Sequence, residues 1–173
     1  MIRSLFIGSI AALWLATPAL ADSANLLGAF KNWQAYSTGT GSSMTCYAMS
    51  APRATEPRGA KRASIYLMVS DWPGRKVKAE PEAAPGYAYK LGAPVALEIG
   101  NDKFNFFARN DGQNGTAWLQ NLKDGDALMD ALNHGVSAVA LGTSARGTKT
   151  MDTYSLAGFA DAVAKIHAAC NMG

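Results

Sequence analysis

The two cysteines, which lie near opposite ends of the chain, constrain the fold more than any other sequence feature. Cys46 falls in a segment, 44–49, that is typical of a strand, and Cys170 continues an apolar stripe of helical spacing near the C-terminus. A disulfide between them would close a loop of about 120 residues and hold the last helix against an early strand. By lowering the entropy of the unfolded chain, such a crosslink would stabilise the fold by about 4–5 kcal/mol. The alternatives are two buried thiols or a bridge between two chains.

The compartment in which the protein works favours the disulfide. Arg3 is followed by an apolar run over 5–16, and Ala19-Leu20-Ala21 places small residues around a cleavage site before Asp22. This layout predicts a secretory signal peptide at residues 1–21 and one mature domain at residues 22–173, since the run is too short to span a membrane. The alternative is a short membrane anchor. In an exported protein an even number of cysteines indicates an intramolecular bridge, here Cys46–Cys170.

Composition excludes some classes of partner. The formal net charge is only +3, without the concentrated basic face expected of a protein that binds nucleic acid. No apolar stretch near 18 residues follows the predicted leader, so we expect no transmembrane segment after cleavage. Gly and Pro are scattered between short apolar runs, which indicates a β-rich chain with many turns.

Alternation of side chains predicts six or seven strands before any helix. Residues 64–70 form a short apolar run typical of a buried central strand. Residues 95–99 and 104–106 alternate on either side of a turn at Gly100-Asn101-Asp102, which predicts a hairpin. Residues 51–62 and 81–89 contain prolines and glycines and are predicted to be irregular.

Two helices are expected after these strands. Asp124 and Asp126 precede the segment 127–134, and His134 and Gly135 end it, which matches the preferences of helix termini. The last helix is predicted from about Ser155, a candidate N-cap, to Ala169. Its apolar stripe consists of Leu156, Phe159, Val163, Ile166 and Cys170. Together these elements predict a mainly β, β-sandwich-like single domain with a short helix near 125–134 and a C-terminal helix packed on the sheet.

No catalytic arrangement rises above background. Ser144 lies in a segment that superficially resembles a nucleophile elbow, but Arg146 replaces the closing glycine. The only candidate bases are His134, which the helix end explains, and His167, for which a structural role at the margin of the stripe is favoured. Two isolated histidines form no zinc pattern. We therefore expect no enzymatic activity, no metal site and no cofactor.

Two further segments have both a functional and a structural interpretation. The basic residues Arg53, Arg58, Lys61 and Arg62 fall in one loop, where solvation is favoured over contact with an anionic lipid or acidic partner. Residues 143–159 are rich in Gly, Thr, Ser and Asp, which predicts an ordered connection into the last helix, with Asp152 and Ser155 satisfying free N–H groups there. The functional alternative for residues 143–159 is a ligand or partner site.

Several short motifs spread along the chain carry a family likeness. They are Trp33, Thr45-Cys46-Tyr47, Gly86-Tyr87, Ala117-Trp118, Arg146-Gly147-Thr148, Asp152-Thr153-Tyr154-Ser155-Leu156, Gly158-Phe159 and Ala169-Cys170. With them the chain resembles the invasion-associated locus B family, exported proteins of alphaproteobacteria, over roughly residues 28–171. The resemblance implies a periplasmic or outer-membrane-associated protein with a compact β-rich fold, and it carries over no catalytic residues.

These observations predict a non-enzymatic binding or interaction module of a Gram-negative cell envelope, located in the periplasm, secreted or associated with the outer membrane. Its partner would be an envelope protein, a lipid or a glycan, and the protein would be a monomer or weak oligomer. The predicted binding surface comprises Trp72, Arg75, Tyr87 and Arg146, because aromatic and Arg side chains are the usual anchors of such contacts. The alternatives are an envelope hydrolase using Ser144 with a histidine, and a purely structural envelope component.

Overall fold

The computed structural model describes residues 23–173, so the predicted signal peptide at 1–21 lies outside the described residues. The first half of the chain forms the strands β1 (Asn25–Phe30), β2 (Trp33–Thr38), β3 (Thr45–Ser50), β4 (Ala54–Glu56), β5 (Tyr66–Trp72) and β6 (Val77–Ala84). The second half forms β7 (Val95–Ile99), β8 (Asp102–Asp111), β9 (Asn114–Leu119), α1 (Gly125–His134), β10 (Ser137–Thr143), β11 (Lys149–Ser155) and α2 (Phe159–Ala169).

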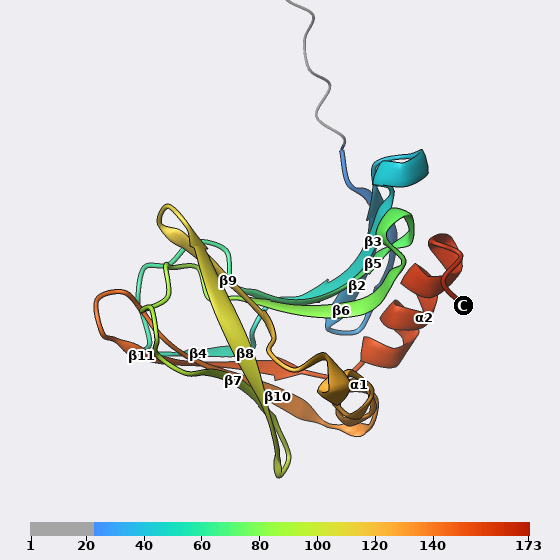
Figure 1. Ribbon diagram of the computed structural model, residues 1–173. Helices are drawn as coiled ribbons and strands as arrows, with labels where there is room; N and C mark the ends of the chain where they lie inside the picture. The colour runs from blue at the N-terminus through green and yellow to red at the C-terminus, as the bar shows by residue number, and fades with distance from the viewer. Residues whose placement is uncertain (1–22) are drawn as a thin grey trace, which may run out of the picture.

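The strands of residues 23–173 form one antiparallel sheet of eleven strands, in the order β1-β2-β3-β5-β6-β9-β8-β7-β10-β11-β4. The sheet curls, so that the half containing β2, β3, β5 and β6 faces the half containing β4, β7, β10 and β11, with β8 crossing from one level to the other (Figure 1). Apolar side chains of both halves fill the space between them. The prediction of a mainly β domain with two layers, a short helix and a C-terminal helix is therefore confirmed.

Local sequence explains the hairpin of β7 and β8. Val95 pairs with Phe106 and Leu97 pairs with Phe104, and all four side chains are buried. Gly100 in the turn has φ +58, a backbone conformation that residues other than glycine rarely adopt. The predicted hairpin is confirmed, as is the helix α1 that follows β9.

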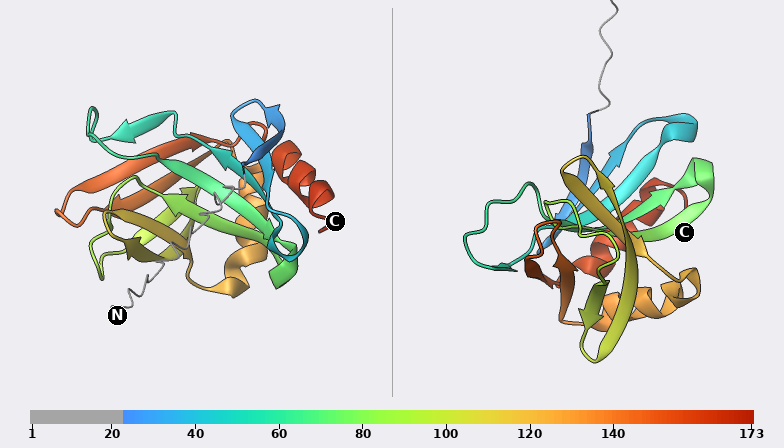
Figure 2. Two further views of the ribbon diagram at one scale, coloured as in Figure 1. Left: turned by 90° about the horizontal axis from the view of Figure 1, so that it is seen from above. Right: turned by 60° about the vertical axis from the view of Figure 1, so that its left-hand side comes forward.

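Helix α2 packs against β1, β2 and β3 through its apolar stripe (Figure 2). Its Phe159 contacts Trp33 of β2 edge to face, with ring centroids 4.9 Å apart, and both side chains are fully buried. The predicted disulfide between Cys46 of β3 and Cys170 at the end of α2 is present and links the helix covalently to the sheet. The described chain contains no free cysteine.

The predicted start of the last helix is wrong. Ser155 is the final residue of β11, and α2 begins at Phe159 after Gly158, which has φ +93. A side chain at Gly158 would place its Cβ 1.9 Å from the carbonyl oxygen of Phe30, so glycine is needed where α2 approaches the β1–β2 hairpin. Residues 149–155 were expected to be a connection because their polar side chains resemble a helix cap, but they form a strand paired with both β10 and β4.

Two segments predicted to be irregular also contain strands. The loop at 51–62 includes the short edge strand β4, and the segment 81–89 begins with the second half of β6. Pro81 lies inside β6 opposite Val69 of β5. On its other side β6 pairs with β9 only at Glu82 and Ala83, so a proline preceding these two residues removes no hydrogen bond that β9 would accept.

Candidate functional site

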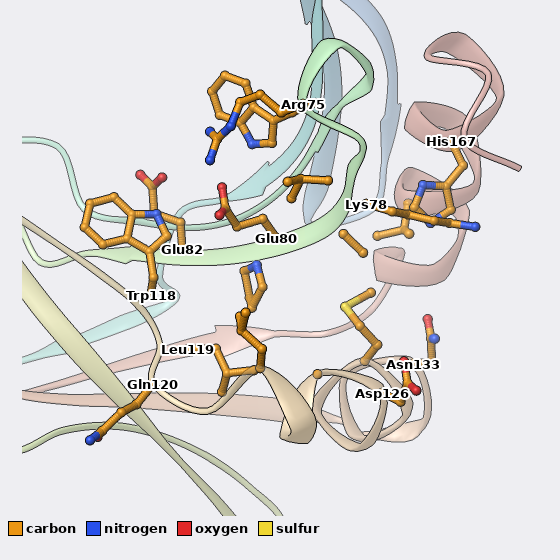
Figure 3. Close-up of a pocket in the computed structure, with 18 of the residues that line it drawn as sticks. Arg75, Lys78, Glu80, Glu82, Trp118, Leu119, Gln120, Asp126, Asn133 and His167 are labelled. Atoms are coloured by element: carbon orange, nitrogen blue, oxygen red, sulfur yellow. The ribbon is translucent and has the colours of Figure 1, made fainter.

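A large open groove lies where β6 and β9 diverge, and α1 and α2 line its other side. We call it the helix-side groove; its volume is about 1250 Å³, and Figure 3 shows the side chains that line it. β6 supplies Lys78, Glu80 and Glu82 to one wall, and β9 supplies Trp118. The groove exists because only two residue pairs join β6 to β9 before the strands separate.

Aromatic rings paired with arginines line the helix-side groove. The guanidinium of Arg75 lies over the Trp72 ring, 5.2 Å from its centroid. The ring centroids of Phe107 and Trp118 are 5.8 Å apart, and the guanidinium carbon of Arg109 lies 5.6 Å from the centroid of the Phe107 ring. Both arginines and Phe107 are exposed, and such cation–π pairs hold flat guanidinium groups where a partner can reach them.

A half-buried carboxyl, that of Glu82, is held by two aromatic side chains. Glu82 accepts a hydrogen bond from the Tyr66 hydroxyl at 3.2 Å, and Trp118 is a second hydrogen-bonding partner. Burial raises the pKa of Glu82 above its ordinary value, although these two hydrogen bonds oppose the shift. Burial also raises the pKa of Tyr66 to about 12, assisted by the neighbouring charge of Glu82.

An imidazole at the end of the groove is held by a fully buried carboxylate. Nδ1 of His167 in α2 lies 2.6 Å from Oδ2 of Asp71 in β5, and the other oxygen, Oδ1, accepts the backbone N–H of Ala79 at 2.9 Å. Ala79 adopts φ +54 beside an irregularity in the β5–β6 register, which turns its N–H toward Asp71. The pair therefore fixes the orientation of the imidazole, which also lines the groove.

A second groove is formed by the connections at the side of the molecule away from the two helices (Figure 1). We call it the loop-end groove; its volume is about 900 Å³. Four segments supply its lining residues: 57–63, 86–88, 112–114 and the β10–β11 turn with the start of β11, 144–150. They are distant in sequence and meet because the curled sheet brings these ends together.

A buried ion pair supports the loop-end groove. Nη1 and Nη2 of Arg62 donate to the two carboxylate oxygens of Asp152 at 2.9 and 2.6 Å, and Nη1 also donates to the Pro85 carbonyl at 3.2 Å. Burial alone would lower the pKa of Arg62, but Asp152 outweighs it and the pKa is raised. The guanidinium also lies 5.8 Å from the centroid of the Tyr87 ring, whose hydroxyl shares a hydrogen bond with Thr150.

The four residues of the predicted binding surface divide between the two grooves. Trp72 and Arg75 line the helix-side groove, whereas Tyr87 and Arg146 line the loop-end groove. None of residues 23–173 lines both grooves, so the four do not form one continuous site. The prediction identified one aromatic residue and one arginine of each groove.

The residues of the hydrolase alternative are also separated. Ser144 lines the loop-end groove, where its hydroxyl accepts the N–H of Thr148, whereas His167 lines the helix-side groove. His134 lies at the exposed end of α1 and contacts Asp130 one turn earlier, as expected for a histidine at a helix C-terminus. The serine and His167 therefore face different parts of the molecule.

Sequence reasoning missed two buried side-chain pairs. Arg62 was expected to be solvated with the other basic residues of its loop, but its side chain is only 5% exposed, and Asp152 was expected at a helix start. No local signal in the sequence paired Asp71 with His167.

Comparisons of the chain with protein-family models, with curated proteins and with solved structures gave no match. The resemblance to the invasion-associated locus B family therefore stays a prediction. Within residues 23–173, no group of three or more His, Cys, Asp or Glu side chains is arranged to hold a metal ion. None of the helices in the described part of the chain has the length and apolar character needed to cross a membrane.

Proposed function

We propose that this protein is an exported, non-enzymatic component of a Gram-negative cell envelope that binds a segment of another envelope protein in its helix-side groove. The observation that carries the proposal is the set of aromatic–arginine contacts on the groove wall, Trp72 with Arg75 and Phe107 with Arg109. Trp, Tyr and Arg dominate the binding energy of protein–protein interfaces, because they combine a large apolar area with directional donors.

Charges of both signs in the groove favour a polypeptide partner. Arg75, Lys78 and Arg109 supply positive charge, and Glu80 and Glu82 supply negative charge. A polypeptide presents apolar, acidic and basic side chains together, so it complements such a surface better than a lipid or a uniformly charged polymer. The groove, at about 1250 Å³, is also larger than most small-molecule sites, which span roughly 300–1000 Å³.

The leader and the disulfide support an envelope location. The Cys46–Cys170 bridge is stable in an oxidising compartment such as the periplasm, and the sequence of residues 1–21 has the layout of a secretory signal. Membership of the invasion-associated locus B family, proposed on the motifs described above, would give the same location. An intact mass beginning at Asp22, with both cysteines resistant to alkylation until reduced, is the result expected of protein from its native host.

The test is crosslinking capture from the native envelope with three forms of the protein. The groove variant Arg75→Glu/Arg109→Glu reverses two exposed charges on the groove wall. The control Arg53→Glu/Lys149→Glu reverses two exposed charges outside both grooves. The proposal predicts one saturable polypeptide partner with the wild type and the control, and its loss with the groove variant.

Two results would contradict the binding proposal. Capture of only abundant bystander proteins by all three forms would instead favour a structural envelope component, which has no saturable partner. Capture of the same partner by the groove variant at wild-type levels would remove the helix-side groove from the proposal.

An envelope hydrolase is the second candidate, because a histidine oriented by a buried carboxylate is the arrangement that a general base requires. Asp71 holds Nδ1 of His167 and leaves the other ring nitrogen to act, although Ser144 lies in the other groove. The test is a panel of ester and peptide substrates with the wild type and His134→Ala/His167→Ala. Hydrolysis by the wild type that the double variant loses would support this candidate; no hydrolysis, or equal hydrolysis by both, would end it.

A further inference from the structure

The loop-end groove has a charge of one sign, unlike the helix-side groove. Lys61, Arg62 and Arg146 line it, and none of the described residues that line it is an aspartate or glutamate. Asp152 neutralises Arg62 from the buried side, whereas Lys61 and Arg146 are exposed and form no ion pair with any residue of the described chain. The groove therefore presents an uncompensated positive charge to solvent, which attracts an anion.

Six further residues that line the loop-end groove carry a hydroxyl or an amide group. These side chains are Tyr87, Gln113, Asn114, Ser144, Thr148 and Thr150. Hydroxyls and amides both donate and accept hydrogen bonds, as the hydroxyls of a sugar do, so such a wall can pair with successive hydroxyls of a saccharide. The volume of about 900 Å³ lies in the range, roughly 300–1000 Å³, that ligand pockets occupy.

Backbone hydrogen bonds hold the segments around the groove in place. They are Ala63 N–H to Gly86 carbonyl at 2.9 Å, Lys90 N–H to Thr143 carbonyl at 2.8 Å, and Ala145 N–H to Ala88 carbonyl at 2.8 Å. Gly86 has φ +73, and a Cβ there would lie 2.5 Å from the carbonyl oxygen of Ala63, so only glycine permits this approach. A groove fixed in this way binds a ligand with little loss of conformational entropy.

We propose that the loop-end groove binds an anionic oligosaccharide carrying sugar carboxylates. Lys61 and Arg146 meet the carboxylates from two different segments that line the groove, and Arg62, anchored on Asp152, holds the loop that carries Lys61. The hydroxyl of Thr148 and the side-chain amides of Gln113 and Asn114, all exposed, pair with the sugar hydroxyls. This site is separate from the one proposed for a polypeptide partner in the helix-side groove, since the two grooves share no lining residue within the described part of the chain.

The test uses calorimetric titration of the mature protein with trigalacturonate, with neutral maltotriose and inorganic phosphate as comparison ligands. The groove variant is Lys61→Ala/Arg146→Ala, and its matched control is Arg58→Ala/Lys149→Ala. The control also removes two positive charges, one from each of the same two segments, but at exposed residues that do not line the groove. All four substituted residues are exposed, so unfolding midpoints are expected to stay close to that of the wild type.

The proposal predicts that trigalacturonate binds and that maltotriose does not. The groove variant should weaken trigalacturonate binding by about tenfold or more, because it removes charge-assisted hydrogen bonds. The control should change binding by no more than about twofold, since exposed charges away from the site contribute little. Binding should also weaken as salt rises.

Any of four results would overturn the proposal. If trigalacturonate did not bind measurably, an oligosaccharide with sugar carboxylates would be excluded as the ligand. If maltotriose bound equally well, recognition by charge would be excluded. Equal loss in the groove variant and the control would indicate a diffuse electrostatic effect rather than a site. Phosphate competing at the same concentration as trigalacturonate would reduce the site to a simple anion site. None of these results depends on the helix-side groove, so the proposed partner binding is tested separately.

Discussion

The substitution Asp152→Asn tests the buried ion pair that supports the loop-end groove. It preserves the shape of the side chain but leaves the charge of Arg62 without its counterion, and the two side chains are only 5% and 3% exposed. Removing one member of a buried pair costs about 3–5 kcal/mol, because the remaining charge stays desolvated. Pro85 and the Tyr87 ring still contact the guanidinium, so we expect the lower end, about 3 kcal/mol.

The assay is urea unfolding at pH 7 with the disulfide intact, followed by tryptophan fluorescence. For a slope of about 1–3 kcal/mol per molar urea, a loss of 3 kcal/mol lowers the midpoint by about 1–3 M. The matched variant Arg62→Met/Asp152→Leu replaces both charges with apolar side chains of similar size. It should be more stable than Asp152→Asn, because it leaves no unpaired charge in the protein.

Two outcomes would refute this reasoning. A loss below about 1 kcal/mol for Asp152→Asn is the value expected of a solvent-exposed pair and would mean that water reaches Arg62. A double variant less stable than the single variant would mean that packing around the two side chains, rather than the unpaired charge, determines the loss. In either case the ion pair would not be what holds the 57–63 segment against the sheet.

Three further predictions follow from the disulfide and from the carboxyl–tyrosine contact. Replacing Cys46 and Cys170 by alanine removes a covalent link between residues that are 124 positions apart in the sequence. The free energy of unfolding, measured in urea, should fall by up to about 5 kcal/mol. A loss below about 1 kcal/mol would contradict the loop-entropy argument. Glu82→Gln should stabilise the protein at pH 7, because the raised pKa of Glu82 in the folded state means that stability falls as the pH rises through that pKa. The gain should vanish below about pH 4, where Glu82 is protonated in both the folded and the unfolded state. A gain that persists at that pH would contradict this cause. Tyr66→Phe should reduce the loss of stability between pH 10 and about 12, because in this range the folded protein keeps the phenol proton that the unfolded chain releases. If the melting temperature of the variant falls with pH as steeply as that of the wild type over this range, the prediction is refuted.

Local signals in the sequence were sufficient for much of the fold. The β7–β8 hairpin follows from alternation around a glycine turn, and α1 follows from its terminal residues. The stripe that ends at Cys170 predicted both the last helix and the direction of its thiol. Each of these inferences depends on residues within one or two turns of each other, where spacing alone determines which side chains share a face.

The two buried side-chain pairs could not be predicted because they join distant parts of the chain. Arg62 and Asp152 are separated by 90 residues, and Asp71 and His167 by 96. An arginine in a Pro-Gly-rich loop looks solvated until the partner that buries it is known. The strand β11 was missed for a related reason: a polar segment such as 149–155 becomes a strand only because β10 and β4 pair with it.

The register of α2 on the sheet couples its two attachments. Asp71 and Cys46 are direct neighbours across β5 and β3, and His167 and Cys170 are three residues apart, on one side of the helix. The rotation and translation of α2 that bring the imidazole to the carboxylate therefore also bring the two sulfurs together. A helix packed one residue out of register would lose both contacts at once. The disulfide can therefore form only when α2 has docked in the correct register.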